Sequence, residues 1–119
     1  MFGEGGRITV KSEGSFATEG TDEDPVVIEG ESATPGYWQG IRFRSNNRNN
    51  SIDEAEIANG GSNGYANVYL DDSSRASVTN CTLRSSSTFG IIAESGTTLE
   101  ASGNTFEDNA DGDIQDQNE

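Results

Sequence analysis

The sequence predicts an all-β fold, a solenoid of about four parallel coils stacked on one another, with little or no helix. Short apolar pairs recur along the chain, each with the every-second-residue rhythm of a strand that buries one face. Polar turns rich in glycine, asparagine and serine separate these pairs. In addition, residues 6–20 align with residues 90–104 without a gap, which matches Ile8 with Ile91 and Phe16 with Leu99. Such similarity between distant segments is typical of repeat proteins.

The spacing of equivalent positions locates the coils. The first strands of successive coils are expected 33, 27, 23 and 23 residues apart, at Ile8, Ile41, Val68, Ile91 and Ile114. The extra residues of the early coils fall in polar loops, as they do in solenoids. A β-sandwich built of hairpins would not make a position resemble the one 23 residues later. Stacked parallel coils do, because like residues then lie above like residues.

The first two coils occupy residues 8–40 and 41–64. Three apolar pairs mark the strands of the first coil, namely Ile8/Val10, Phe16/Thr18 and Val26/Ile28. Pro25 opens the third strand, where a missing N–H is tolerated. The buried positions of the second coil are predicted at Ile41, Phe43, Ile52, Ala55 and Ile57. Residues 51–59 are the one stretch compatible with a helix, and they are too few to form a stable one alone.

The later coils are shorter and more regular. Their strand pairs are Val68/Leu70, Ala76/Val78 and Cys81/Leu83 in the third coil, then Ile91/Ala93, Leu99/Ala101 and Asn104/Phe106 in the fourth. A fifth coil begins at 112–114, and residues 115–119 are predicted to be a frayed acidic tail. The whole chain, 1–119, is expected to be one β-helix domain taken from a larger protein. The predicted core is Ile8, Val10, Phe16, Ile28, Ile41, Phe43, Ile52, Ile57, Val68, Leu70, Val78, Leu83, Ile91, Leu99 and Phe106.

Composition limits the partners. Hydrophobic residues make up 30% of the chain and the net charge is −14, values that alone would suggest disorder if the apolar residues were not so regularly phased. An acidic surface repels nucleic acid, so no nucleic-acid partner is expected. The longest apolar runs are too short to span a membrane, and no membrane insertion is expected. An acid-rich, lysine-poor composition fits either a protein adapted to high salt or a surface kept acidic for solubility.

The region around the first two coils resembles a known family. It reads Gly20-Thr21 followed by Pro25-Val26 and Ile28, and then Pro35-Gly36-Tyr37-Trp38-Gln39-Gly40-Ile41-Arg42-Phe43. This phrase, with the corner segments 80–83 and 104–106, is similar to the right-handed parallel β-helix repeat domains of the pectate-lyase-like superfamily. The resemblance implies a right-handed coil and a setting in a secreted or surface-attached microbial protein. The chain departs from the family at its N-terminal end, where the usual capping helix is not visible in the sequence. That end would then be open to association. Enzymes, adhesins and spacers all share this fold, so the resemblance says little about function.

No catalytic set is recognisable in the sequence. The chain contains no histidine, which excludes a Ser-His-Asp triad and any histidine base. Glycosidases of the resembled superfamily combine aspartates with a histidine and an Arg-x-Lys motif, and Lys11 has no arginine two residues before it. Asp71 and Asp72 are the one pair that invites comparison, and we interpret them as a solvated turn. We therefore expect no enzyme; the alternative is the remnant of a polysaccharide lyase or hydrolase.

Two weaker site hypotheses come from residue type. Trp38, Tyr65 and Tyr69 would offer aromatic faces to a carbohydrate if their coils aligned, although Trp38 is better interpreted as a packed corner residue. Asp22 and Asp24, or Asp111 and Asp113, would offer oxygen ligands for a weakly bound Ca²⁺, but neither pair belongs to a recognised calcium motif. No other cofactor is expected.

The sequence therefore predicts a non-catalytic structural, display or adhesion module of an extracellular or cell-surface protein. The alternative is a carbohydrate-binding module. The expected partners are a polysaccharide or flanking coils of the same protein.

Overall fold

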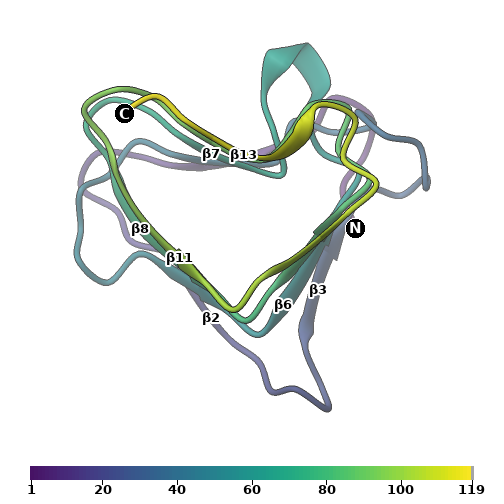
Figure 1. Ribbon diagram of the computed structural model, residues 1–119, viewed down its shortest axis with the longest axis horizontal. Coiled ribbons are helices and arrows are strands. Elements are labelled where there is room, and N and C mark those ends of the chain that lie inside the picture. Colours follow the sequence, from purple (N-terminus) through teal and green to yellow (C-terminus); the bar gives the residue numbers. More distant parts are fainter. Residues whose placement is uncertain (119) are drawn as a thin grey trace.

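The computed structural model describes residues 1–118, which form a three-sided parallel solenoid (Figure 1). Viewed along the stack, the coils superpose as a triangle, with one sheet on each side. The first sheet contains β1 (Ile8–Val10), β4 (Ile41–Phe43), β7 (Val68–Leu70), β10 (Phe89–Ala93) and β13 (Gly112–Asp116). The second contains β2 (Ala17–Glu19), β5 (Ser51–Asp53), β8 (Arg75–Thr79) and β11 (Thr98–Ser102). The third contains β3 (Val26–Glu29), β6 (Ala55–Ala58), β9 (Thr82–Arg84) and β12 (Thr105–Glu107).

The register confirms the predicted stacking. Every strand pair within the three sheets is parallel, and the pairing runs from Ile8 to Ile41, Val68, Ile91 and Ile114 in turn. The loops absorb the unequal coil lengths, and the one helical element in residues 1–118 is the short 3₁₀ turn η1 (Ser62–Gly64). Positions predicted to be equivalent are therefore neighbours on successive coils.

The core is a single column of apolar side chains inside the triangle. All fifteen predicted core residues belong to it: eleven are buried, while Ile8, Phe16, Leu99 and Phe106 are partly buried and pack against the rest. These four half-buried residues lie at the ends of the stack. Ile8 is on β1 and Phe16 directly precedes β2, while Leu99 is on β11 and Phe106 is on β12. Each fully buried aliphatic side chain contributes about 1.5–3 kcal/mol by leaving water.

Single residues in the left-handed conformation turn the chain at one corner of the second, third and fourth coils. Between the second and third sheets these are Glu54, Asn80 and Gly103, with φ values of 53°, 53° and 68°. A side-chain amide on the next coil forms hydrogen bonds with the backbone at this corner. The Asn104 amide accepts the N–H of Cys81 at 2.9 Å and donates to the carbonyl of Val78 at 2.9 Å. Asn80 itself is exposed and donates to Asp53 Oδ1.

Both chain ends are more ordered than the sequence suggests. The predicted frayed tail is wrong for Gln115 and Asp116, because β13 extends through them and pairs with β10. Glu119 lies outside the described residues. At the other end, Phe2 bridges to Gly30 and its ring stacks on Trp38 with centroids 4.3 Å apart. The N-terminal segment therefore covers one corner of the first coil, although no capping helix is present in residues 1–118.

Candidate functional site

The outer face of the first sheet gathers the polar side chains that strand alternation turns away from the core. One row across the strands contains Thr9, Arg42, Tyr69, Ile92 and Gln115, which pair in register. A second row, two residues further along each chain segment, contains Lys11, Arg44, Asp71, Glu94 and Gln117. Backbone hydrogen bonds continue the sheet into this second row, for example from Arg44 N to Val10 O at 2.8 Å. Coil stacking thus brings together side chains that lie 23 to 33 residues apart in sequence.

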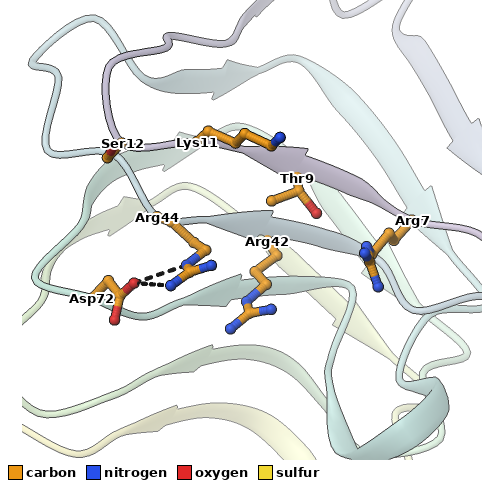
Figure 2. A pocket seen from close by; sticks show the side chains of 7 residues that line it. All are labelled: Arg7, Thr9, Lys11, Ser12, Arg42, Arg44 and Asp72. Atoms are coloured by element: carbon orange, nitrogen blue, oxygen red, sulfur yellow. Dashed lines mark hydrogen bonds and ion pairs between the residues drawn. The ribbon is translucent and has the colours of Figure 1, made fainter.

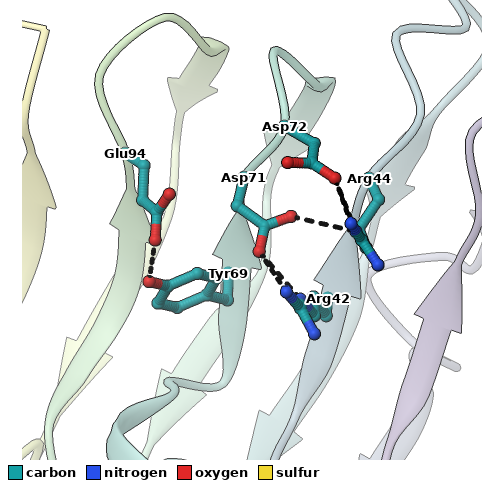
Figure 3. A network of polar contacts seen from close by, with 6 residues as sticks. All are labelled: Arg42, Arg44, Tyr69, Asp71, Asp72 and Glu94. Carbon is teal, nitrogen blue, oxygen red and sulfur yellow. Dashed lines mark hydrogen bonds and ion pairs between the residues drawn. The ribbon is translucent and has the colours of Figure 1, made fainter.

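Ion pairs link neighbouring coils on this face (Figure 3). Arg42 donates from Nε and Nη2 to Asp71 Oδ2 at 2.8 and 2.6 Å. Arg44 donates to Asp72 Oδ2 and places its Nε 3.6 Å from Asp71 Oδ1. The Asp71 side chain is 8% exposed, whereas that of Asp72 is 56% exposed. The hydrogen bond from Arg42 to Asp71 raises the pKa of the guanidinium above its ordinary value, so Arg42 is positively charged at neutral pH.

A pair of tyrosines adjoins the ion pairs. Tyr65 and Tyr69 meet edge to face, with ring centroids 4.9 Å apart, and the guanidinium of Arg42 lies 5.2 Å from the centre of the Tyr65 ring. The Tyr69 hydroxyl donates to the carboxylate of Glu94. Burial, and then this hydrogen bond, raise the pKa of Tyr69, which keeps the hydroxyl protonated. The aromatic pair is therefore fixed in place by charged neighbours on both sides.

The structure separates the three aromatic residues predicted to bind carbohydrate. Tyr65 and Tyr69 come together on the outer face, as alignment of their coils requires. Trp38 does not join them, because it is fully buried and donates from Nε1 to the carbonyl of Ala58 at 2.7 Å. The binding hypothesis is therefore wrong for Trp38, and its interpretation as a packed corner residue is confirmed.

The carboxylates behave differently from the sequence-based interpretation. Asp72 is exposed, as expected of a solvated turn, but that description is wrong for Asp71, which Arg42 holds on the sheet face. Both of its ion-pair partners, Arg42 and Arg44, lie on the preceding coil. The four candidate calcium ligands, Asp22, Asp24, Asp111 and Asp113, are all exposed. Within residues 1–118 no three carboxylate or thiol side chains gather as a metal site would require.

A basic pocket that sequence reasoning missed lies at the N-terminal end of the same face (Figure 2). Arg7, Thr9 and Lys11 line it from β1 and its flanks, and Ser12 follows them. Arg42 lines it from β4, Arg44 lines it from the residue that follows β4, and Asp72 closes one side. Its volume is about 380 Å³. The sequence did contain a signal for this pocket. Basic residues occupy alternate positions in residues 7–11 and 42–44, and the coil register places these two segments side by side.

The fold and this face define the class of protein, a parallel β-helix with a polar, partly ion-paired outer sheet. The model of the family described as "right handed beta helix region" matches residues 7–118, and the chain belongs to that family. The resemblance seen in the sequence is thereby confirmed. No curated protein and no solved structure matches the chain. Among residues 1–118, no helix has the length and apolar character needed to cross a membrane.

Proposed function

We propose that the chain is a non-catalytic display or adhesion module of an extracellular or cell-surface protein, and that the outer face of the first sheet is its contact surface. The observation that supports this most is the internal pairing of charges on that face. Arg42 and Arg44 are occupied by Asp71 and Asp72, and Tyr69 is occupied by Glu94. The acidic composition is consistent with a setting of high salt, where screening weakens the repulsion among surface acids.

This arrangement is poorly suited to acid–base catalysis. A general acid or base must reach the reacting atom and exchange a proton with it. Asp71 directs one carboxylate oxygen at Arg42, 2.6 Å away, and the other at Arg44, 3.6 Å away, and its side chain is almost closed to solvent. The sequence supplies no histidine to act in its place. The face therefore offers fixed charges and rings, which are features of a binding or spacing surface.

Incubation of the chain with polygalacturonate and alginate tests this assignment. We expect neither unsaturated products nor new reducing ends, because Asp71, Asp72 and Glu94 are each hydrogen-bonded to a neighbouring side chain. Cleavage that disappears in the Asp72→Asn variant would overturn the proposal and favour a polysaccharide lyase or hydrolase. Cleavage that persists in that variant would overturn it too, and would place the reactive groups elsewhere.

Carbohydrate binding is a second candidate function, and one observation favours it. Tyr65 and Tyr69 form a fixed edge-to-face pair beside the basic pocket. Rigid aromatic side chains with a polar end supply contact area at a small cost in conformational entropy. Within the proposed function, a glycan is therefore the partner that best fits this part of the face.

A further inference from the structure

Two segments of the chain carry an asparagine followed two residues later by a hydroxyl side chain. They are residues 49–51 (Asn-Asn-Ser) and residues 80–82 (Asn-Cys-Thr). An asparagine two places before serine or threonine, with any residue but proline between them, is the acceptor for N-linked glycosylation in secreted proteins. A motif this short also arises by chance, so the surroundings of each amide decide its value. Both acceptor asparagines, Asn49 and Asn80, are exposed.

The middle residue of the first triplet is anchored inside the solenoid. Asn50 is 1% exposed, and its Oδ1 accepts the N–H of Phe16 at 3.0 Å. Its Nδ2 donates to the carbonyls of Ser45 and Arg75 at 3.0 and 3.1 Å. Phe16 and Arg75 belong to the coils before and after that of Asn50, so this one amide ties three coils together. The turn is therefore fixed by an inward residue, and the side chains on either side of Asn50 remain outside the core.

The acceptor side chain of this triplet is free. Asn49 lies in the segment between β4 and β5 and is held through its backbone, whose N–H donates to Asn47 Oδ1 at 2.8 Å. Within residues 1–118 its side-chain amide has no hydrogen-bond partner, and neither has the hydroxyl of Ser51. Ser51 is half-buried and opens β5, directly before the buried Ile52. The amide and the hydroxyl that a transferase must reach are thus both available in the folded chain.

The second triplet presents its amide less well. The Nδ2 of Asn80, the atom that would carry a sugar, donates to Asp53 Oδ1 at 3.2 Å. The Oδ1 of Asn80 lies against the next coil, since a Cβ added to Gly103 would come within 2.6 Å of it. The backbone of Asn80 has φ of 53° and donates its N–H to the carbonyl of Ser102 at 3.1 Å. A sugar on Asn80 would have to break the contact with Asp53 at a tight corner, so the structure favours Asn49.

The position of Asn49 also suits a display module. Ser51 begins a strand of the second sheet, whose outer face is a different side of the triangle from the proposed contact surface on the first sheet (Figure 1). A glycan attached at residue 49 would therefore extend from the corner between the two sheets. It would add a bulky, solvated group to the surface without displacing a core side chain.

We propose that Asn49 is an N-glycosylation site. The donor is a lipid-linked glycosyl pyrophosphate, and the catalyst is a membrane oligosaccharyltransferase. Nδ2 of Asn49 forms a bond to C1 of the first sugar while the bond from C1 to the pyrophosphate oxygen breaks. The lipid pyrophosphate leaves with that electron pair, and a base of the transferase takes the amide proton. The inference rests on the proposed extracellular setting, because secreted proteins are the ones that receive such glycans.

The test uses the full folded chain, a lipid-linked oligosaccharide donor and a single-subunit oligosaccharyltransferase that requires only the triplet. Intact-protein mass spectrometry measures incorporation, and tandem spectrometry of proteolytic peptides locates it. We expect one glycan per chain, on Asn49. Asn49→Gln and Ser51→Ala should each abolish the product, whereas Ser51→Thr, which keeps the hydroxyl, should retain it. Asn80→Gln is the matched control and should leave incorporation unchanged.

Three outcomes would overturn the inference. They are no incorporation by a transferase that is active on a control peptide, incorporation at Asn80 equal to or above that at Asn49, and a product that survives Ser51→Ala. Asn49 is exposed, and the side chain of Ser51 forms no hydrogen bond within residues 1–118, so the variants should fold with an unchanged melting temperature. The result is distinct from that of the polygalacturonate and alginate assay. Glycan transfer together with polymer cleavage would keep the site and reject the non-catalytic function, whereas neither transfer nor cleavage would do the reverse.

Discussion

Replacing Trp38 with alanine should lower the free energy of unfolding by about 3–5 kcal/mol. The side chain is fully buried, stacks on Phe2 and donates to the carbonyl of Ala58, so the substitution leaves a cavity and an unpaired carbonyl. Urea denaturation followed by circular dichroism would measure the loss. The variant also removes the support of Phe2, so the N-terminal segment should become sensitive to proteolysis.

The matched control is Tyr65→Ala, another aromatic deletion on a neighbouring coil. Tyr65 lies on the outer face and is partly exposed, so we expect a loss of stability of about 1 kcal/mol, the typical value for such an aromatic pair. A loss at Trp38 no larger than that at Tyr65 would contradict the position of Trp38 in the core.

The Gly40→Ala substitution should also be strongly destabilising, by about 3 kcal/mol or more. Gly40 immediately precedes β4 with φ of +97°, a conformation that disfavours a side chain. A Cβ added there would overlap the carbonyl oxygen of Ala66 and come within 2.9 Å of that of Asn67. The latter carbonyl accepts the N–H of Ile41, so the backbone cannot retreat without breaking the sheet. Melting temperature and urea midpoint are the measurements.

Gly64→Ala provides the comparison for that prediction. Gly64 has a similar φ of +82°, but an added Cβ would meet nothing within 4 Å. The cost there should be confined to backbone strain, about 1–2 kcal/mol. If the two alanine variants proved equally stable, the coils would not approach each other at Gly40 as closely as the structure shows.

The fold could be predicted from the sequence because the same physical rule applies to every coil. Inward positions must be apolar on every coil, and a slip of one residue would turn a whole strand outward. Ile41, Val68 and Ile91 each satisfied that rule on successive coils, and the register confirms it. Trp38 was harder to place, because it lies between strands, where alternation gives no direction.

The candidate site could be predicted only in part. Tyr69 lies between the apolar pair Val68 and Leu70, so strand alternation places it on the outer face, where the structure has it. The basic pocket depends instead on which outward residues become neighbours across coils. The same register that aligned Ile8 with Ile41 also placed Thr9 beside Arg42, so the information was available for the outer face too. The environment of Asp71 could not be predicted from the sequence. It depends on how the side chains of Arg42 and Arg44 extend from the previous coil to pair with the carboxylate.

The central claim is that successive coils stack in parallel, so that residues 27 and 23 positions apart in sequence become neighbours. Solution NMR of this 12.6 kDa chain tests it directly through backbone NOEs across the first sheet. We expect contacts of the parallel-strand type between Ile41 and Val68 and between Val68 and Ile91. Contacts of the antiparallel type between strands adjacent in sequence, with none between those pairs, would contradict the structure and the pocket built on it.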